Sequence, residues 1–209
     1  MIRIEIWGDF ASFNRPELKV ERYSYDVITP AAARNILQAI YWHPSFDWIV
    51  DKIWIINPIK RMTIKTNEVK NKGSYPDMKS AALGKRKSPH LTVDRTQRSA
   101  SILKDVRYVI EAHFVETGEG FDKNKIYAIF CERAKKGKCF HMPWLGTREF
   151  AADFRLVSKD EEIVPYDLNG DLGIMEYDID FSKETPEPYY FHAKVHHGLM
   201  DLTECEVIR

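Results

Sequence analysis

Alternation of apolar and polar residues predicts two strands, one at the start of the chain and one near its middle. In IRIEIW (2–7) every second residue is isoleucine, and the residues between are charged or aromatic. In DVRYVIEAHFV (105–115) the even positions are apolar, which predicts a buried face. The opposite face then carries Arg107, Val109, Glu111, His113 and Val115. The stretches 47–59 and 61–67 are also strand-like, and we expect the second to pair with the first.

Two further segments have the period of an amphipathic helix. The first begins with Thr29 as N-cap and Pro30 at the first helical position, and Pro44 ends it. Its apolar stripe consists of Ala33, Ile36, Leu37 and Ile40. The second helix lies between Asp122 and Gly137, which are typical start and end residues.

The order of these elements predicts the fold class. It reads β-α-β-β, an insertion, then β-α-β, which indicates an α+β protein with a ferredoxin-like, RRM-type domain. The insertion, residues 69–101, has no regular pattern and is rich in Lys, Arg, Ser and Gly. Later short strand-like pieces predict a small C-terminal antiparallel β domain. We therefore expect two domains, 1–153 and 154–209.

The net charge of zero conceals a separation of charge along the chain. Residues 60–107 contain thirteen Lys or Arg and four Asp or Glu, a balance of +9. Residues 158–188 contain ten acidic residues and two lysines, a balance of −8. The basic segment either binds a polyanion or pairs with the acidic one. Its candidate phosphate contacts, which a solvated loop would also explain, are Lys85, Arg86, Lys87, Arg95 and Arg98.

Composition narrows the classes of protein to which the chain can belong. With 44% hydrophobic residues, the 209-residue chain can form a sizeable core. It has no apolar run long enough to cross a bilayer and no signal-peptide pattern, so we expect a cytoplasmic protein. Three cysteines, and no Asp/Glu/His cluster with metal-ligand spacing, favour a protein without disulfides, metal or cofactor.

The candidate chemistry lies at the end of the first helix and on the strand around residue 113. Tyr41, Trp42 and His43 stand directly before Pro44, and packing explains the two rings more readily than the imidazole. His113 projects from the non-core face of its strand. Each has an ordinary alternative, a core aromatic for Tyr41 and an exposed strand residue for His113.

Four segments in this order resemble one family: WGDFASF (7–13), YSYDVITPAAARNILQAIYWHP (23–44), LKDVRYVIEAHF (103–114) and AKKGKCFHMPWLGTREF (134–150). They are similar to the subtype I-C (Dvulg) branch of the Cas-five proteins, CRISPR-associated members of the RAMP superfamily. The resemblance implies an RRM-like domain followed by a small β domain. It also implies a metal-independent endoribonuclease that cuts the CRISPR repeat transcript. Such a protein keeps the 5′ handle as a subunit of a type I-C Cascade complex.

In this resemblance, His113 and Tyr41 match the family's functional histidine and tyrosine. Metal-free RNA cleavage must deprotonate a 2′-hydroxyl, stabilise charge on phosphorus and protonate the leaving 5′-oxygen. Histidine can move these protons because its usual pKa is about 6.5. Tyr41 would orient the 2′-hydroxyl or donate a hydrogen bond to phosphate, so we expect both rings over the same ribose. Arg148, in LGTRE, is a candidate contact to the repeat hairpin.

One position departs from the family pattern. Family members carry a lysine near the histidine, whereas Glu111 and Ala112 precede His113 here. Glu111 would repel phosphate but could orient His113, and His43 is a second candidate proton carrier. Another cation must therefore stabilise the negative charge that develops on the phosphate. The candidates are Lys104, Arg107 and the Gly-Lys-Arg-Lys run at 84–87.

Three functions compete at this stage. The leading one is the endoribonuclease that remains in the complex. The alternative is a non-catalytic subunit that holds the crRNA handle or double-stranded DNA, which the absent lysine favours. An unrelated RRM-like RNA binder is disfavoured, because no strand carries an RNP1-like Lys-Gly-Phe-Gly-Phe string. We expect CRISPR repeat RNA and other Cascade subunits as partners, and no membrane.

Overall fold

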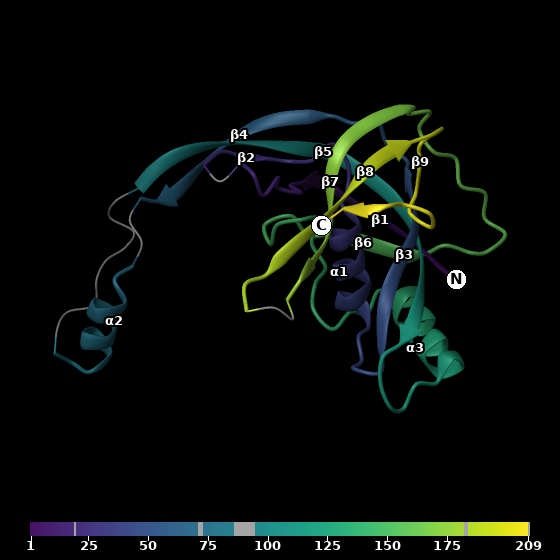
Figure 1. Cartoon of the computed structure of the whole chain (residues 1–209), viewed down its shortest axis with the longest axis horizontal. Helices are drawn as coiled ribbons and strands as arrows, with labels where there is room; N and C mark the ends of the chain where they lie inside the picture. The colour runs from purple at the N-terminus through teal and green to yellow at the C-terminus, as the bar shows by residue number, and fades with distance from the viewer. Residues whose placement is uncertain (19, 71–72, 86–94, 182–183, 209) are drawn as a thin grey trace.

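The computed structural model describes residues 1–18, 20–70, 73–85, 95–181 and 184–208. They form an α+β structure with two sheets, as the sequence predicted (Figure 1). The seven-stranded sheet contains β1 (Ile2–Ala11), β2 (Arg22–Tyr23), β3 (Phe46–Ile55), β4 (Arg61–Val69), β5 (Arg95–Glu116), β6 (Asp153–Leu156) and β9 (Leu199–Asp201). The three-stranded sheet contains β7 (Gly170–Asp180), β8 (Glu187–Val195) and β10 (Val207–Ile208). The helices are α1 (Pro30–Ile40), α2 (Tyr75–Ala82) and α3 (Lys123–Lys135).

The elements of the predicted succession, β-α-β-β, an insertion, then β-α-β, are present in that order as β1, α1, β3, β4, β5, α3 and β6. β1, α1, β3, β5, α3 and β6 follow one another along the chain, and their strands lie in the sheet order β6-β1-β5-β3. β5 runs antiparallel to both β1 and β3, and its Ile110 lies between Ile4 and Ile53. All three isoleucines are fully buried. The even positions of β5 therefore face the core, which confirms the predicted alternation.

The two predicted helices are also confirmed, and each begins at the predicted cap. The Thr29 hydroxyl accepts a hydrogen bond from the Ala32 backbone N–H (3.2 Å), and Pro30 opens α1. The Asp122 carboxylate accepts hydrogen bonds from two backbone N–H groups at the start of α3. Both helices bury an apolar stripe, which in α3 consists of Ile126, Phe130 and Ala134.

β4 and the first half of β5 form an arm that leads away from the body, with α2 near its tip (Figure 1). β4 pairs with β5, so the predicted pairing of 61–67 with 47–59 is wrong. The prediction of an irregular stretch over 69–101 is wrong in part, because α2 and the start of β5 lie there. α2 has no buried residue, and polar residues fill both sides of the ribbon. The strand predicted over 61–67 is confirmed as part of β4, whereas no apolar period marks α2 or the start of β5.

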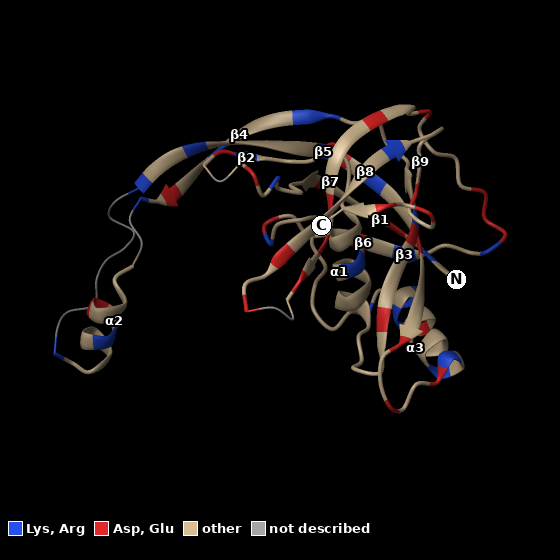
Figure 2. Cartoon of the chain, viewed as in Figure 1, with Lys and Arg blue, Asp and Glu red and all other residues tan. Residues whose placement is uncertain are grey.

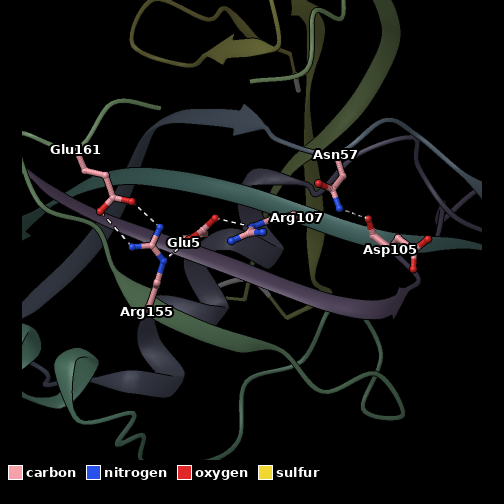
Figure 3. A network of polar contacts seen from close by, with 6 residues as sticks. All are labelled: Glu5, Asn57, Asp105, Arg107, Arg155 and Glu161. Atoms are coloured by element: carbon pink, nitrogen blue, oxygen red, sulfur yellow. Dashed lines mark hydrogen bonds and ion pairs between the residues drawn. The ribbon is translucent and has the colours of Figure 1, made fainter. Parts of the chain in front are cut away.

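The arm leaves the body where β5 bends at Asp105. This residue has a φ of 52°, in the left-handed region that aspartate tolerates better than most residues. The Asn57 amide donates a hydrogen bond to the Asp105 carbonyl oxygen at 2.8 Å (Figure 3). The Lys60 ammonium lies 3.2 Å from the Asp105 carboxylate. These contacts stabilise the bend.

The C-terminal residues contribute to both sheets. β7, β8 and β10 form the predicted small antiparallel sheet, while β6 and β9 join the edges of the large one. Met175 of β7 and Phe191 of β8 are buried in the same core cluster as Ile53. An ion pair between Arg34 of α1 and Asp178 of β7 links this helix to the small sheet. The division into 1–153 and 154–209 stays a prediction.

Candidate functional site

His113 forms a close pair with a buried carboxylate on the non-core face of the large sheet. Its Nδ1 lies 2.9 Å from Oδ1 and 2.9 Å from Oδ2 of Asp51, on the neighbouring strand β3. The His113 side chain is 43% exposed, whereas that of Asp51 is 9% exposed. One side of the imidazole therefore faces a buried anion, and much of the rest is open to solvent.

A β-bulge positions Asp51. In the β3–β5 register, Val50 lies opposite Ala112 and Lys52 lies opposite Glu111, so Asp51 is the extra residue between them. The bulge turns the Asp51 carboxylate toward His113. Sequence reasoning missed Asp51, and the available signal was a single aspartate inside an apolar strand, IVDKIWI.

This arrangement favours proton transfer by His113. A carboxylate accepts hydrogen bonds only, so it favours the tautomer in which Nδ1 carries the proton. Nε2 then presents its lone pair as a proton acceptor. A half-exposed imidazole with a fixed tautomer can take a proton from a bound hydroxyl and return one to a leaving group.

Tyr41 lies at the end of α1, in a different environment. Its backbone N–H donates to the Leu37 carbonyl, and its extended conformation ends the helix. The ring centroid lies 5.7 Å from that of Phe46, and the Arg133 guanidinium of α3 stands 4.8 Å from the same ring. The Tyr41 ring is therefore held between an aromatic and a cation.

The structure does not bring Tyr41 and His113 together. Phe46, the partner of Tyr41, packs on Phe114 at 5.7 Å, and successive residues of a strand point to opposite faces. His113 therefore lies on the face opposite Tyr41. The expectation that both rings meet over one ribose is not met, because α1 covers the core face whereas His113 points away from it.

Two other residues predicted for the site, Glu111 and Arg107, lie on the same face as His113 but form ion pairs with residues of β1. Glu111, the predicted orienting carboxylate, pairs with Arg3 at 2.6 Å, and Asp51 occupies the position next to His113 instead. The Nε of Arg107 donates to Glu5 at 2.6 Å (Figure 3). Both ion pairs use the non-core face of neighbouring strands β1 and β5.

Distance along β5 separates the remaining predicted cations from His113. A strand rises about 3.3 Å per residue, so Arg107 is roughly 20 Å from His113 along β5, and Lys104 lies beyond the bend at Asp105. Neither can stabilise charge on a phosphate that His113 contacts. Lys104 is exposed and lies at the base of the arm, where it could meet a different phosphate.

The other predicted cations belong mostly to the arm, whose ribbon carries Lys and Arg positions along its length (Figure 2). Lys85 follows α2 and is exposed, and Arg95 starts β5 opposite Val69. Arg98 donates to the Val20 carbonyl and pairs with a glutamate of β4. Arg86 and Lys87 lie outside the described residues.

Arg148 and His43 occupy turns. Arg148 is exposed, two residues after Gly146, whose φ is 85°. A Cβ on Gly146 would lie 2.1 Å from the Ser12 carbonyl oxygen, so this turn requires glycine. His43 is exposed between α1 and β3, and its Nδ1 lies 2.8 Å from the Ser45 hydroxyl.

Within the described residues there is neither a metal-binding cluster nor a membrane-spanning helix. Residues 1–18, 20–70, 73–85, 95–181 and 184–208 contain no group of three or more His, Cys, Asp or Glu placed to hold a metal ion. No helix within the same ranges is long and apolar enough to cross a membrane.

The fold and sequence identify the class of protein. A family model described as CRISPR-associated protein (Cas5) matches residues 1–202, so the chain belongs to this family, in its Cas5d branch. It is 45% identical to the CRISPR pre-crRNA endoribonuclease Cas5d of Mannheimia succiniciproducens, over 96% of this chain and 94% of that protein. It is 36% identical to the Thermus thermophilus protein of the same name, over 96% and 90%. A crystal structure of a CRISPR-associated protein superposes with a TM-score of 0.74 at 26% identity, covering 100% of this chain and 96% of that one.

Proposed function

We propose that this chain is a metal-independent endoribonuclease that cuts CRISPR repeat RNA. The observation that carries the proposal is the His113–Asp51 pair on the non-core face of the large sheet. Two relatives named as pre-crRNA endoribonucleases, at 45% and 36% identity, support it. The protein acts in the cytoplasm, uses no cofactor, and keeps the 5′ handle as a subunit of a type I-C Cascade complex.

His113 moves the protons of the reaction. The 2′-oxygen loses its proton and attacks the adjacent phosphorus, while the bond from phosphorus to the 5′-oxygen breaks. The products are a 2′,3′-cyclic phosphate and a 5′-hydroxyl, which gains a proton. Nε2 of His113 is the group that takes up or supplies a proton, and Asp51 positions it and stabilises the imidazolium. DNA is not cut, because it lacks the 2′-hydroxyl.

Lys52 is the candidate for the cation that the family's lysine would supply. Ala112, directly before His113, is fully buried, so a lysine there would point into the core. Lys52 lies opposite Glu111 in the β3–β5 register. Lys52 is therefore a diagonal neighbour of His113, at roughly 7–8 Å. Its ammonium is 3.6 Å from Asp201, a loose and partly exposed pair. Lys52→Ala should slow cleavage more than Lys52→Arg, measured as single-turnover rates.

Tyr41 acts in RNA binding under this proposal. Its ring lies on the opposite face from His113, beside the Arg133 guanidinium. A phenol ring with a cation over its face suits contact with a phosphate or ribose. Tyr41→Phe should therefore weaken binding of repeat RNA more than it slows cleavage of the bound RNA.

The alternative function is a non-catalytic subunit that holds the crRNA handle or double-stranded DNA. The separation of Tyr41 from His113 and the buried Ala112 favour it. Incubation of the protein with its own repeat RNA in EDTA separates the two functions. We expect one cut with a 2′,3′-cyclic phosphate end, and no cut but full binding when the scissile nucleotide is 2′-deoxy. Binding without any cleavage of the all-ribose RNA would establish the alternative.

A further inference from the structure

Four large apolar side chains are exposed around the end of α1. They range from 38% exposed for Trp144 to 84% for Phe140, and the other two are Trp42 and Met142. The backbone N–H groups of Phe140 and His141 lie 2.8 and 3.4 Å from the Ala39 carbonyl oxygen, three residues before Trp42. The His141 ring lies 5.8 Å from that of Phe140 and 5.6 Å from that of Trp144. We call the surface of Trp42, Phe140, His141, Met142 and Trp144 the aromatic platform.

The backbone beneath the platform is well anchored. The Pro143 carbonyl accepts a hydrogen bond from Ala152 (2.9 Å), and the Leu145 N–H donates to Phe150 (2.7 Å). Leu145 itself is fully buried. Phe140, His141 and Trp144 are thus exposed in mutual ring contact on a fixed backbone, and a cluster of exposed aromatic side chains of this kind marks an interaction site.

Cations precede the platform in the chain, at the end of α3. Lys135, Lys136 and Lys138 are exposed at the end of α3, and Lys138 N–H donates to the Arg133 carbonyl. The Arg133 guanidinium donates to the Ile40 carbonyl at 3.0 Å, which ties the end of α3 to the end of α1. Lys135 lines a pocket with Arg3 and Lys159, so Lys136 and Lys138 are the lysines available to the platform. Lys136 pairs with Glu132 within α3. Exposed rings beside lysines fit a ligand with both flat faces and negative charge.

We propose that the aromatic platform binds unpaired nucleotides of RNA by base stacking, with the α3 lysines contacting their phosphates. Stacking on aromatic rings and a cationic border are the two components of single-strand binding sites. The inference deepens the proposed function and rests on it for the identity of the RNA. Tyr41, held under Arg133, lies at the border of the platform, which explains a binding role on the face opposite His113.

A short unstructured oligoribonucleotide containing 2-aminopurine tests the proposal with the full-length protein. The native protein should bind it and quench its fluorescence, and Phe140→Ala and Trp144→Ala should each weaken binding about five- to a hundredfold. Phe140→Trp should retain binding, whereas Phe140→Leu, which keeps apolar area without a ring, should not. Phe181→Ala, which changes a phenylalanine that is 70% exposed directly after β7, is the matched control and should bind normally.

Different results would overturn RNA binding by the platform and the proposed endoribonuclease activity. Unchanged oligonucleotide binding in Phe140→Ala and Trp144→Ala, with equal thermal stability, would overturn the platform. Loss of assembly with other Cascade subunits, with RNA binding intact, would assign the surface to a protein partner and also overturn it. A native protein that binds the oligonucleotide and quenches its fluorescence but never cuts repeat RNA would refute the proposed endoribonuclease activity. The same result would still support RNA binding by the platform.

Discussion

Two buried carboxylates on the same face of the large sheet have opposite surroundings. Glu5 of β1 lies between the guanidinium groups of Arg107 and Arg155, and Arg155 also pairs with Glu161 (Figure 3). Asp51 of β3 instead faces the imidazole of His113. Both carboxylates are less than 10% exposed, so burial does not distinguish them.

The difference lies in whether the partner can lose a proton. Hydrogen bonds to Glu161 and Glu5 raise the pKa of Arg155, so its guanidinium stays charged and the Glu5 network is a permanent structural contact. An imidazole can be neutral or charged near neutral pH. The Asp51 pair can therefore take part in acid–base chemistry, whereas the Glu5 network cannot.

The largest expected effect follows from removing the imidazole. His113→Ala should slow single-turnover cleavage roughly 10²–10⁴-fold while RNA binding stays near the native value. His197→Ala is the matched control, because His197 also pairs with an aspartate, at 2.8 Å, but with both side chains exposed. Equal rates for both variants would show that the His113 pair has no catalytic role.

A smaller loss is expected when the buried carboxylate becomes an amide. The Asp51→Asn amide can donate to Nδ1, which moves the imidazole proton to Nε2, and cleavage should slow roughly ten- to a hundredfold. ¹⁵N NMR of His113 should report the changed tautomer, and Asp51→Glu should restore part of the rate. A slow variant that keeps the native tautomer would indicate a structural role for Asp51 alone.

Changing the other carboxylate should affect stability and not chemistry. Glu5→Gln weakens the hydrogen bonds to two guanidinium groups, and we expect a loss of about 1–2 kcal/mol in the free energy of unfolding. The cleavage rate of the folded protein should be unchanged. Urea denaturation measures the first effect, and the single-turnover assay the second. A rate loss as large as that of Asp51→Asn would remove the distinction between the two carboxylates.

The sequence predicts the parts of the fold that have a regular apolar period. Thr29 and Pro30 locate the start of α1, and alternation along β5 places His113 off the core. In the arm the sequence predicts the strand over 61–67, but it does not predict α2, which buries nothing, or the start of β5, where exposed and half-buried residues alternate.

The partners of site residues were harder to predict. Asp51 reaches His113 through a bulge, and alternation alone does not locate a bulge. The partner of Arg107, Glu5, lies 102 residues earlier in the chain, so Arg107 looked available for phosphate. Tyr41 follows the helix, and its face of the sheet is decided by Phe46 packing on Phe114. Tertiary contacts, which no local pattern encodes, decided each of these cases.

Chemical rescue of His113→Ala tests the central claim most directly. The native side chain is 43% exposed, so free imidazole can reach the position that the substitution vacates. In EDTA, added imidazole should restore cleavage of repeat RNA in a concentration-dependent manner, with the same 2′,3′-cyclic phosphate end, and should not accelerate the native protein. Cleavage by the variant at the native rate without imidazole, or a loss that imidazole leaves unchanged, would contradict proton transfer by His113.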